Sequence, residues 1–331
     1  KINKHCFPNG LRLVHYEDTS TQMVALNIVY DVGARDEHPE HTGFAHLFEH
    51  LMFGGSAHIP DYDTPLQLAG GENNAWTNND ITNYYLTVPK PNVETAFWLE
   101  SDRMLELAFS EQSLEVQRGV VMEEFKQRCL NQPYGDVGHL FRPLAFRVHP
   151  YRWPTIGKEL SHIEQATLDE VKSFFYRFYA PNNAVLAVTG NISWDETVKL
   201  TEKWFAPIPR RDVPVRQLPQ EPEQTQERRL TVERNVPLDA LFMGYHMCSR
   251  EGADYYAFDI LSDILSNGRS SRLNRRLVQE QNIFSGIDAY ISGTRDAGLL
   301  QISGKPAAGV SLEQAEAAVL EPYQQAYGLF G

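Results

Sequence analysis

A proline-rich stretch divides this chain of 331 residues into two parts. Its prolines, which stand among mostly polar residues, are Pro207, Pro209, Pro214, Pro219 and Pro222. Proline fixes φ and removes a backbone donor, so such a stretch favours extended chain over packed helix. The length also exceeds that of one typical domain, about 100–200 residues. The sequence therefore predicts a first domain over residues 1–206, a linker over 207–228 and a second domain over 229–331.

Strands and helices are predicted in mixed order before this linker. Segments that alternate apolar with polar residues, or that are continuously apolar, predict strands over residues 11–16, 23–30, 81–88 and 183–190. Helical spacing and end signals predict helices over residues 43–53, 92–108, 111–130 and 167–179. This order favours an α+β fold over strict βαβ winding.

Charge, hydropathy and cysteine usage exclude several classes of protein. The formal charge of −13 argues against a nucleic-acid partner, because affinity for nucleic acid depends on Lys and Arg neutralising phosphate. It suits basic or neutral peptides. No apolar run approaches the roughly 18–20 residues of a membrane span. The three cysteines are far apart and odd in number, so they predict no disulfide framework.

The compartment is left open by the sequence. No apolar segment typical of a signal peptide follows the first residues, but the chain does not begin with Met, which leaves room for a removed upstream segment. We favour the cytoplasm over the periplasm as an expectation.

The segment His46-Leu47-Phe48-Glu49-His50 predicts a metal site. On a helix, positions i and i+4 lie one turn apart on the same face, so both imidazoles can reach one ion. Glu49 lies at the edge of that face, where its carboxylate can reach a water on the metal. Neutral imidazole suits zinc, and a catalytic zinc has three protein ligands and an open position. The alternative is that two core histidines and a helix glutamate coincide by chance.

A third ligand is predicted in helix 111–130, for which Ser113 is a plausible N-cap. Gln117, Val121, Glu124 and Arg128 share one stripe of this helix, which directs Glu124 toward an apolar environment. The alternative is that Glu123 and Glu124 are both solvated helix charges. The residues of this helix alone leave that choice open.

The second part of the chain repeats the apolar pattern of the first. Residues 241–246 match the strand at 25–30, and residues 256–265 match the helix at 43–52. In this alignment the three motif positions, His46, Glu49 and His50, fall on Asp259, Ser262 and Asp263. The pattern therefore predicts a second domain that repeats the fold element without the metal-binding residues.

The inverted motif and a glutamate 74 positions after His50 resemble the pitrilysin-type (M16, inverzincin) metallopeptidases. These include bacterial zinc proteases and the zinc-bearing β subunit of the mitochondrial processing peptidase. Further segments are similar as well: residues 33–37, 42–45, 70–71, 74–75, 80–82, 84–85, 120–124 and 179–183.

The resemblance implies roles for individual residues. His46, His50 and Glu124 match the ligands of one zinc ion, and Glu49 matches the general base. Asn74 and Ala75 match the strand edge that pairs with substrate backbone, while Gln117 and Glu123 are expected beside the ligands. Family members often have a glutamate where this chain has Gln117, a departure that affects metal affinity or rate.

The family also implies an architecture and a partner. Its members form clamshells, each half with two similar domains of mixed, mostly antiparallel sheet and helices; the second domain here is short by that measure. Members active alone use an Arg and a Tyr from the opposite half, where alignment places Val278 and Ser285 in this chain. We therefore expect a homologous partner subunit that supplies these donors, or a homodimer.

The function predicted from these observations is zinc-dependent cleavage of peptides or unfolded polypeptides. One alternative is a non-catalytic scaffold subunit of the same family, although such subunits usually lose ligands that this chain retains. Another is an S-ribosylhomocysteine lyase, which shares the inverted motif but is a small single-domain protein.

Overall fold

The computed structural model describes residues 1–327, which form two compact units. Unit 1 comprises residues 1–132 and 148–222, and unit 2 comprises residues 133–147 together with the chain from residue 223 onward. The predicted division assigned residues 133–147 to the first domain. They belong to unit 2 because the helix they form packs on a strand of that unit. The last four residues of the predicted second domain lie outside the described residues.

Unit 1 is built on a six-stranded sheet with the strand order β1-β2-β6-β3-β5-β4. The strands are β1 (Asn3–Cys6), β2 (Arg12–Glu17), β3 (Met23–Tyr30), β4 (Glu72–Thr77), β5 (Thr82–Pro89) and β6 (Ala184–Gly190). Neighbouring strands are antiparallel, except that β2 and β6 are parallel. The α+β class and the mostly antiparallel sheet are therefore confirmed, and β4 lies at one edge of this sheet.

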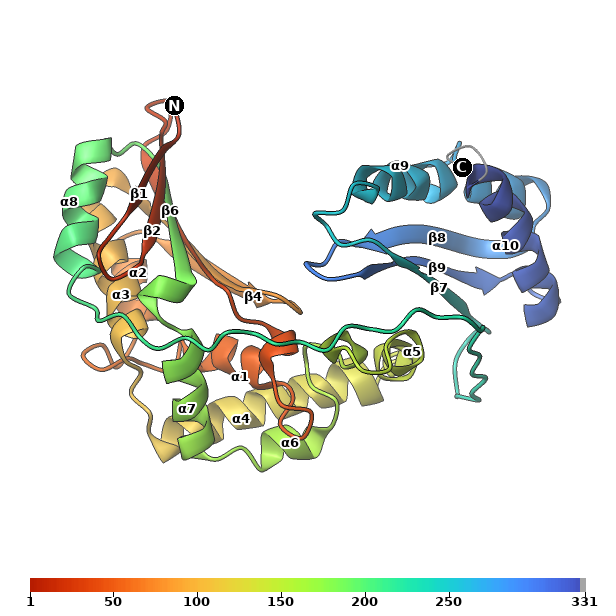
Figure 1. The fold of residues 1–331 in the computed structure, drawn as a ribbon, viewed down its shortest axis with the longest axis horizontal. Helices are drawn as coiled ribbons and strands as arrows, with labels where there is room; N and C mark the ends of the chain where they lie inside the picture. Colours follow the sequence, from red (N-terminus) through yellow and green to blue (C-terminus); the bar gives the residue numbers. More distant parts are fainter. Residues whose placement is uncertain (328–331) are drawn as a thin grey trace. The chain divides into compact units, whose positions relative to one another are not determined.

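The helices of unit 1 gather on one face of its sheet (Figure 1). They are α1 (Phe44–Leu51), α2 (Asp63–Leu68), α3 (Val93–Leu105), α4 (Glu111–Phe125), α6 (Leu160–Glu164), α7 (Leu168–Phe178) and α8 (Trp194–Trp204), with short helical turns at Ala34–Asp36, Lys90–Asn92, Pro150–Arg152 and Pro181–Asn183. Strand β3 shows why one face is covered: Val24, Leu26 and Ile28 alternate with less buried residues and are almost fully buried. This period-two pattern is typical of a sheet with one face in the core.

Helix α4 begins one turn earlier than its predicted cap implies. The hydroxyl of Ser110 accepts a hydrogen bond from the backbone N–H of Ser113 (3.0 Å), so Ser110 is the N-cap. The prediction of Ser113 as the cap was wrong. Ser110 and Ser113 both precede the apolar residues of this helix, so the sequence did not distinguish between them. The α-helix ends at Phe125, and a π-helical turn, Lys126–Leu130, completes the predicted segment 111–130.

Unit 2 contains a three-stranded antiparallel sheet in the order β7-β9-β8. Its elements are α5 (Val137–Ala145), β7 (Leu241–Met247), α9 (Tyr255–Ser266), a π-helical turn (Asn274–Glu280), β8 (Phe284–Ser292), β9 (Gly298–Pro306) and α10 (Leu312–Tyr327). Leu261 and Leu265 of α9 pack with Leu300 and Ile302 of β9 in the core of this unit. A Cβ added at Gly244 would lie 2.5 Å from the ring of Phe141, so this glycine lets α5 approach β7.

No helix or strand forms between Trp204 and Leu241 in the described chain, as the prolines predict. Two arginines hold the first part of this segment to unit 1. Arg211 donates hydrogen bonds to the carbonyls of Tyr179 (2.6 Å) and Leu105 (2.5 Å), which lie at the ends of α7 and α3. Arg216 pairs with Asp31 (2.8 Å). These bonds extend unit 1 well beyond the predicted domain end at residue 206.

Among the helices described here, none combines the length and the hydropathy that a membrane crossing demands.

Candidate metal centre

Helix α1 holds two imidazoles and a carboxylate on the side that is not occupied by its apolar residues. Phe44, Leu47, Phe48 and Leu51 are buried in the core of unit 1. The remaining side faces α4 and β4, against both of which α1 packs. The i, i+4 spacing of His46 and His50 places their rings side by side, with centroids 4.9 Å apart.

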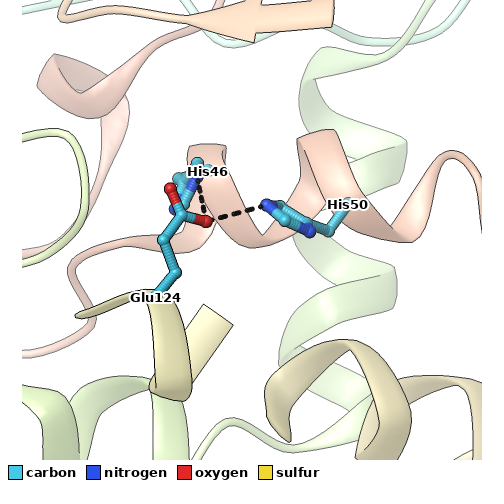
Figure 2. Close-up of side chains that lie close together, drawn as sticks. All are labelled: His46, His50 and Glu124. Carbon is cyan, nitrogen blue, oxygen red and sulfur yellow. Dashed lines mark ion pairs between the residues drawn. The ribbon is translucent and has the colours of Figure 1, made fainter. Parts of the chain in front are cut away.

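Helix α4 brings Glu124 to these two rings. Its neighbours Val121 and Phe125 are buried and fix the orientation of this helix face. One carboxylate oxygen of Glu124, Oε2, lies 3.5 Å from His46 Nε2 and 3.3 Å from His50 Nε2 (Figure 2). The structure therefore brings together the three side chains that the sequence predicts as ligands.

The separations of these atoms fit a zinc ion. Zinc binds imidazole nitrogen and carboxylate oxygen at roughly 2.0–2.1 Å, so two ligands at a tetrahedral angle lie about 3.3 Å apart. Within the described part of the chain, these three residues form the only group of His, Cys, Asp or Glu side chains close enough to share a metal ion. In α9, the corresponding residues Asp259 and Asp263 form no such group.

The protonation states also favour metal binding. Burial lowers the pKa of His46 to about 4, so its imidazole is neutral at physiological pH, the form that binds a metal. The contact with His50, more than any other, lowers the pKa of Glu124, whose carboxylate is therefore ionised. The Nε2 atom of His46 faces Glu124, and its Nδ1 atom is buried without a hydrogen-bond partner among the described residues.

Arg128 contacts the same carboxylate from the π-helical turn after α4. It lies 2.9 Å from Oε1 of Glu124, while Oε2 faces the histidines. The two carboxylate oxygens thus have separate partners, which restricts rotation of the group. The sequence placed Arg128 on the same helix stripe as Glu124 but predicted no role for it. The spacing of four residues between the two is the signal that could have predicted their ion pair.

Glu49 lies beside this cluster without joining it. Burial raises the pKa of its carboxyl group. The nearby hydroxyl of Thr77, the last residue of β4, opposes that effect, although it forms no hydrogen bond of normal geometry in the described structure. A half-buried carboxyl group with a raised pKa next to a metal site is typical of a general base.

The predicted substrate residues lie on β4, the edge strand next to α1. Asn74 is exposed and Ala75 is half-buried, and only one side of β4 pairs with another strand. The Asn74 side chain accepts a hydrogen bond from the backbone N–H of Ala75 (2.8 Å). This edge leaves backbone groups available to an added strand.

The two residues expected beside the ligands have other surroundings. Glu123 is exposed, and its side chain lies near Gln127 and Lys126 (3.4 and 3.9 Å), so its assignment next to the ligands is corrected. Adjacent helix residues point about 100° apart, so Glu123 and Glu124 cannot both face α1. Gln117 lies near Gly54, just after α1, and has no described polar contact with the ligands.

The positions aligned with the Arg and Tyr donors lie in unit 2. Val278 belongs to the π-helical turn Asn274–Glu280, and Ser285 lies on β8, where its hydroxyl donates to the carbonyl of Lys305 (3.0 Å). Val278 has no polar side-chain atom, and Ser285, whose hydroxyl is donated to Lys305, has neither the guanidinium of Arg nor the phenol of Tyr.

Two family descriptions match this chain. Residues 12–137 match the insulinase family, peptidase family M16, and residues 165–324 match the peptidase M16 inactive domain. The second match fits a repeat that lacks the metal-binding residues.

Individual relatives agree with these matches. The zinc protease PqqE of Helicobacter pylori is 31% identical over 283 residues, which cover 84% of this chain and 64% of that protein. The uncharacterized zinc protease YmxG of Bacillus subtilis is 26% identical, over 92% of this chain and 73% of that protein. This chain thus spans somewhat less than two thirds of the length of PqqE.

Solved structures show the same fold. A protease from Helicobacter pylori superposes with a TM-score of 0.91 at 28% identity, over 97% of this chain and 78% of that chain. Pitrilysin superposes with a TM-score of 0.74 at 19% identity, over 99% of this chain and 36% of that chain. On its two matched segments and its fold, this chain belongs to peptidase family M16.

Proposed function

We propose that this chain is the zinc-bearing subunit of an endopeptidase, with His46, His50 and Glu124 as the zinc ligands and Glu49 as the general base. One observation supports this most: two imidazole nitrogens lie 3.5 and 3.3 Å from a single carboxylate oxygen, at the spacing that zinc ligands have. When bound, a zinc ion lowers the pKa of its water toward about 7 and polarises a carbonyl group.

The chain's own residues would move the proton. Glu49 accepts a proton from the attacking water and later returns it to the leaving amine, which is the usual task of one carboxylate in such hydrolysis. Its raised pKa brings it closer to the working pH than an exposed glutamate. Arg128 holds the carboxylate of Glu124 in place while this occurs.

The substrate in this proposal is a peptide in extended conformation. Strand β4 is unpaired on one side, and a peptide that adds there would form main-chain hydrogen bonds along the edge at Asn74 and Ala75. The Asn74 side chain, which bonds the N–H of Ala75 in this structure, would then have to release it. Because α1, which carries Glu49, packs against this strand, the peptide would pass close to the general base. The net charge of −13 favours basic or neutral peptides over acidic ones.

A second subunit completes the site in this proposal. The oxyanion that develops during hydrolysis needs a further donor, and the loss of one such donor typically costs about 10²–10³ in rate. Val278 has no side-chain donor and the Ser285 hydroxyl is donated to Lys305, so we propose a homologous subunit bearing Arg and Tyr as the source. A second copy of this chain has the same Val278 and Ser285, so a homodimer would have to supply the donor from another position.

Zinc analysis combined with a cleavage assay tests this function. The purified chain should contain one zinc ion and should cleave an unstructured peptide weakly alone and strongly with its genomic neighbour. Strong cleavage by the chain alone would contradict the need for a partner. The absence of stoichiometric zinc would favour a non-catalytic scaffold subunit instead.

A further inference from the structure

The carboxyl group of Glu37 lies at the N-terminus of α1, and N–H donors face both of its oxygens. Oε1 accepts from the backbone N–H of Ala45 (2.9 Å), and Oε2 accepts from that of Gly43 (2.9 Å). The indole N–H of Trp153 donates to Oε2 as well (3.1 Å). With 7% of its surface exposed, Glu37 has little access to water.

These bonds replace a cap that α1 otherwise lacks. The first turn of a helix leaves backbone N–H groups without partners, and a side chain at the N-cap usually satisfies one of them. The N-cap of α1 is Gly43, which has no side chain and a φ of +86°. Glu37 therefore supplies, from six residues upstream, the acceptor that Gly43 cannot.

The direction of α1 depends on this first turn. The helix has only eight residues, and helices this short have little intrinsic stability. Ala45 immediately precedes His46, and His50 and Glu49 follow one turn later. A shift of the first turn would thus move two ligands and the general base together, relative to Glu124 on α4.

Glu37 is itself held by the chain around it. The indole N–H of Trp153 also donates to the carbonyl of Ala34 (3.0 Å). The backbone N–H groups of Ala34 and Arg35 donate to the carbonyls of Asn78 (3.1 Å) and Asn79 (2.9 Å), which follow β4. The same anchor therefore connects the start of α1 to the end of the strand that carries Asn74 and Ala75.

We propose that Glu37 is a positioning residue of the metal centre, which caps α1 and thereby holds His46 and His50 at the separation that one ion requires. This inference rests on the proposed zinc site. Among the described contacts of Glu37, none is with His46, His50, Glu124, Asn74 or Ala75, so its effect on the ligands is transmitted through α1. A purely structural role would reduce stability alone, whereas a positioning role also reduces zinc affinity.

Competition with a chromophoric chelator measures the zinc dissociation constant of the full chain, at a pH of about 8.5. Burial raises the pKa of Glu37 to about 8, so at this pH the ionised carboxylate can accept all three hydrogen bonds. Glu37→Gln keeps the size of the side chain but turns an amide donor toward N–H groups. We expect its zinc dissociation constant to rise about 10–100-fold, the usual effect of losing a residue that orients a ligand.

Asp102→Asn is the matched control. Asp102 is another buried carboxylate of unit 1, and it accepts from the backbone N–H of His58 (3.0 Å) and the hydroxyl of Ser56 (2.5 Å). It has no described contact with α1. We expect this variant to lose thermal stability while its zinc dissociation constant changes less than about twofold.

The outcomes separate the two proposals. If wild type binds no zinc, the proposed function fails and this inference with it. If wild type binds zinc and folded Glu37→Gln binds it equally well, the inference alone is overturned. Should Glu37→Gln not fold, Trp153→Phe removes one donor from Glu37 more mildly: an unchanged dissociation constant overturns the inference, and an increase beyond that of Asp102→Asn supports it.

Discussion

Replacing Glu49 with glutamine should separate zinc binding from catalysis. Glu49 lies outside the group of three side chains that can share an ion, so the substitution leaves the ligand set intact. It removes one negative charge near the site but no ligand, so the zinc dissociation constant should change less than about tenfold. Losing a general base typically costs about 10²–10⁴ in rate. We expect kcat to fall by that factor.

The pH profile gives a second reading of the same variant. Burial raises the pKa of Glu49 above its ordinary value of 4.5. The pH at which kcat/KM of wild type falls to half its maximum, on the acid side of the profile, should therefore lie above 4.5. Activity should fall as the pH drops through the raised pKa, because a protonated carboxyl group cannot accept a proton. The residual activity of Glu49→Gln should not show this fall at acid pH.

The assay compares initial rates of cleavage of an unstructured fluorogenic peptide by the zinc-loaded protein together with its partner subunit. Glu123→Gln is the matched control, because Glu123 is exposed, neighbours a ligand in sequence and has described polar contacts within its own helical segment alone. It should retain wild-type activity within about twofold. If Glu49→Gln kept more than a tenth of the wild-type rate, or lost its zinc, the assignment of Glu49 as base would be refuted.

Two further predictions concern the ligands themselves. Arg128→Ala should raise the zinc dissociation constant about two- to fivefold, because Arg128 is largely exposed and ion pairs with an exposed partner contribute roughly 0.2–1 kcal/mol. An unchanged constant in chelator competition would argue against its role. Burial lowers the pKa of His46 to about 4 from an ordinary value of 6.5, so the unfolded chain binds a proton in this range that the native chain does not. Urea unfolding of the metal-free chain should therefore show stability falling as pH drops from 6.5 to about 4, by up to about 1.4 kcal/mol per pH unit, and His46→Gln should reduce this slope.

Local patterns predicted much of the fold. Strands at residues 23–30 and 183–190 follow from period-two alternation, and the helix carrying His46 follows from its apolar spacing. Sequence patterns could not show that residues 133–147 join unit 2, because that depends on the packing of Phe141 over Gly244. Such contacts join segments about a hundred residues apart and leave no periodic signal.

The part of the site that depends on local spacing was predictable from the sequence. His46, Glu49 and His50 share one helical turn, so their arrangement follows from spacing. The sequence could not choose between Glu123 and Glu124 until the resemblance to a family was considered, because the orientation of α4 is set by tertiary packing of Val121 and Phe125. Glu37 was noted only as part of a similar segment; its role depends on a loop that returns its carboxyl group to α1.

Anomalous diffraction from zinc-soaked crystals, measured at the zinc absorption edge, would test the metal centre most directly. We expect one strong peak per chain, about 2.0–2.1 Å from His46 Nε2, His50 Nε2 and a carboxylate oxygen of Glu124. A peak elsewhere, or a Glu124 side chain turned away from both imidazoles in the soaked crystal, would contradict the site on which this account depends.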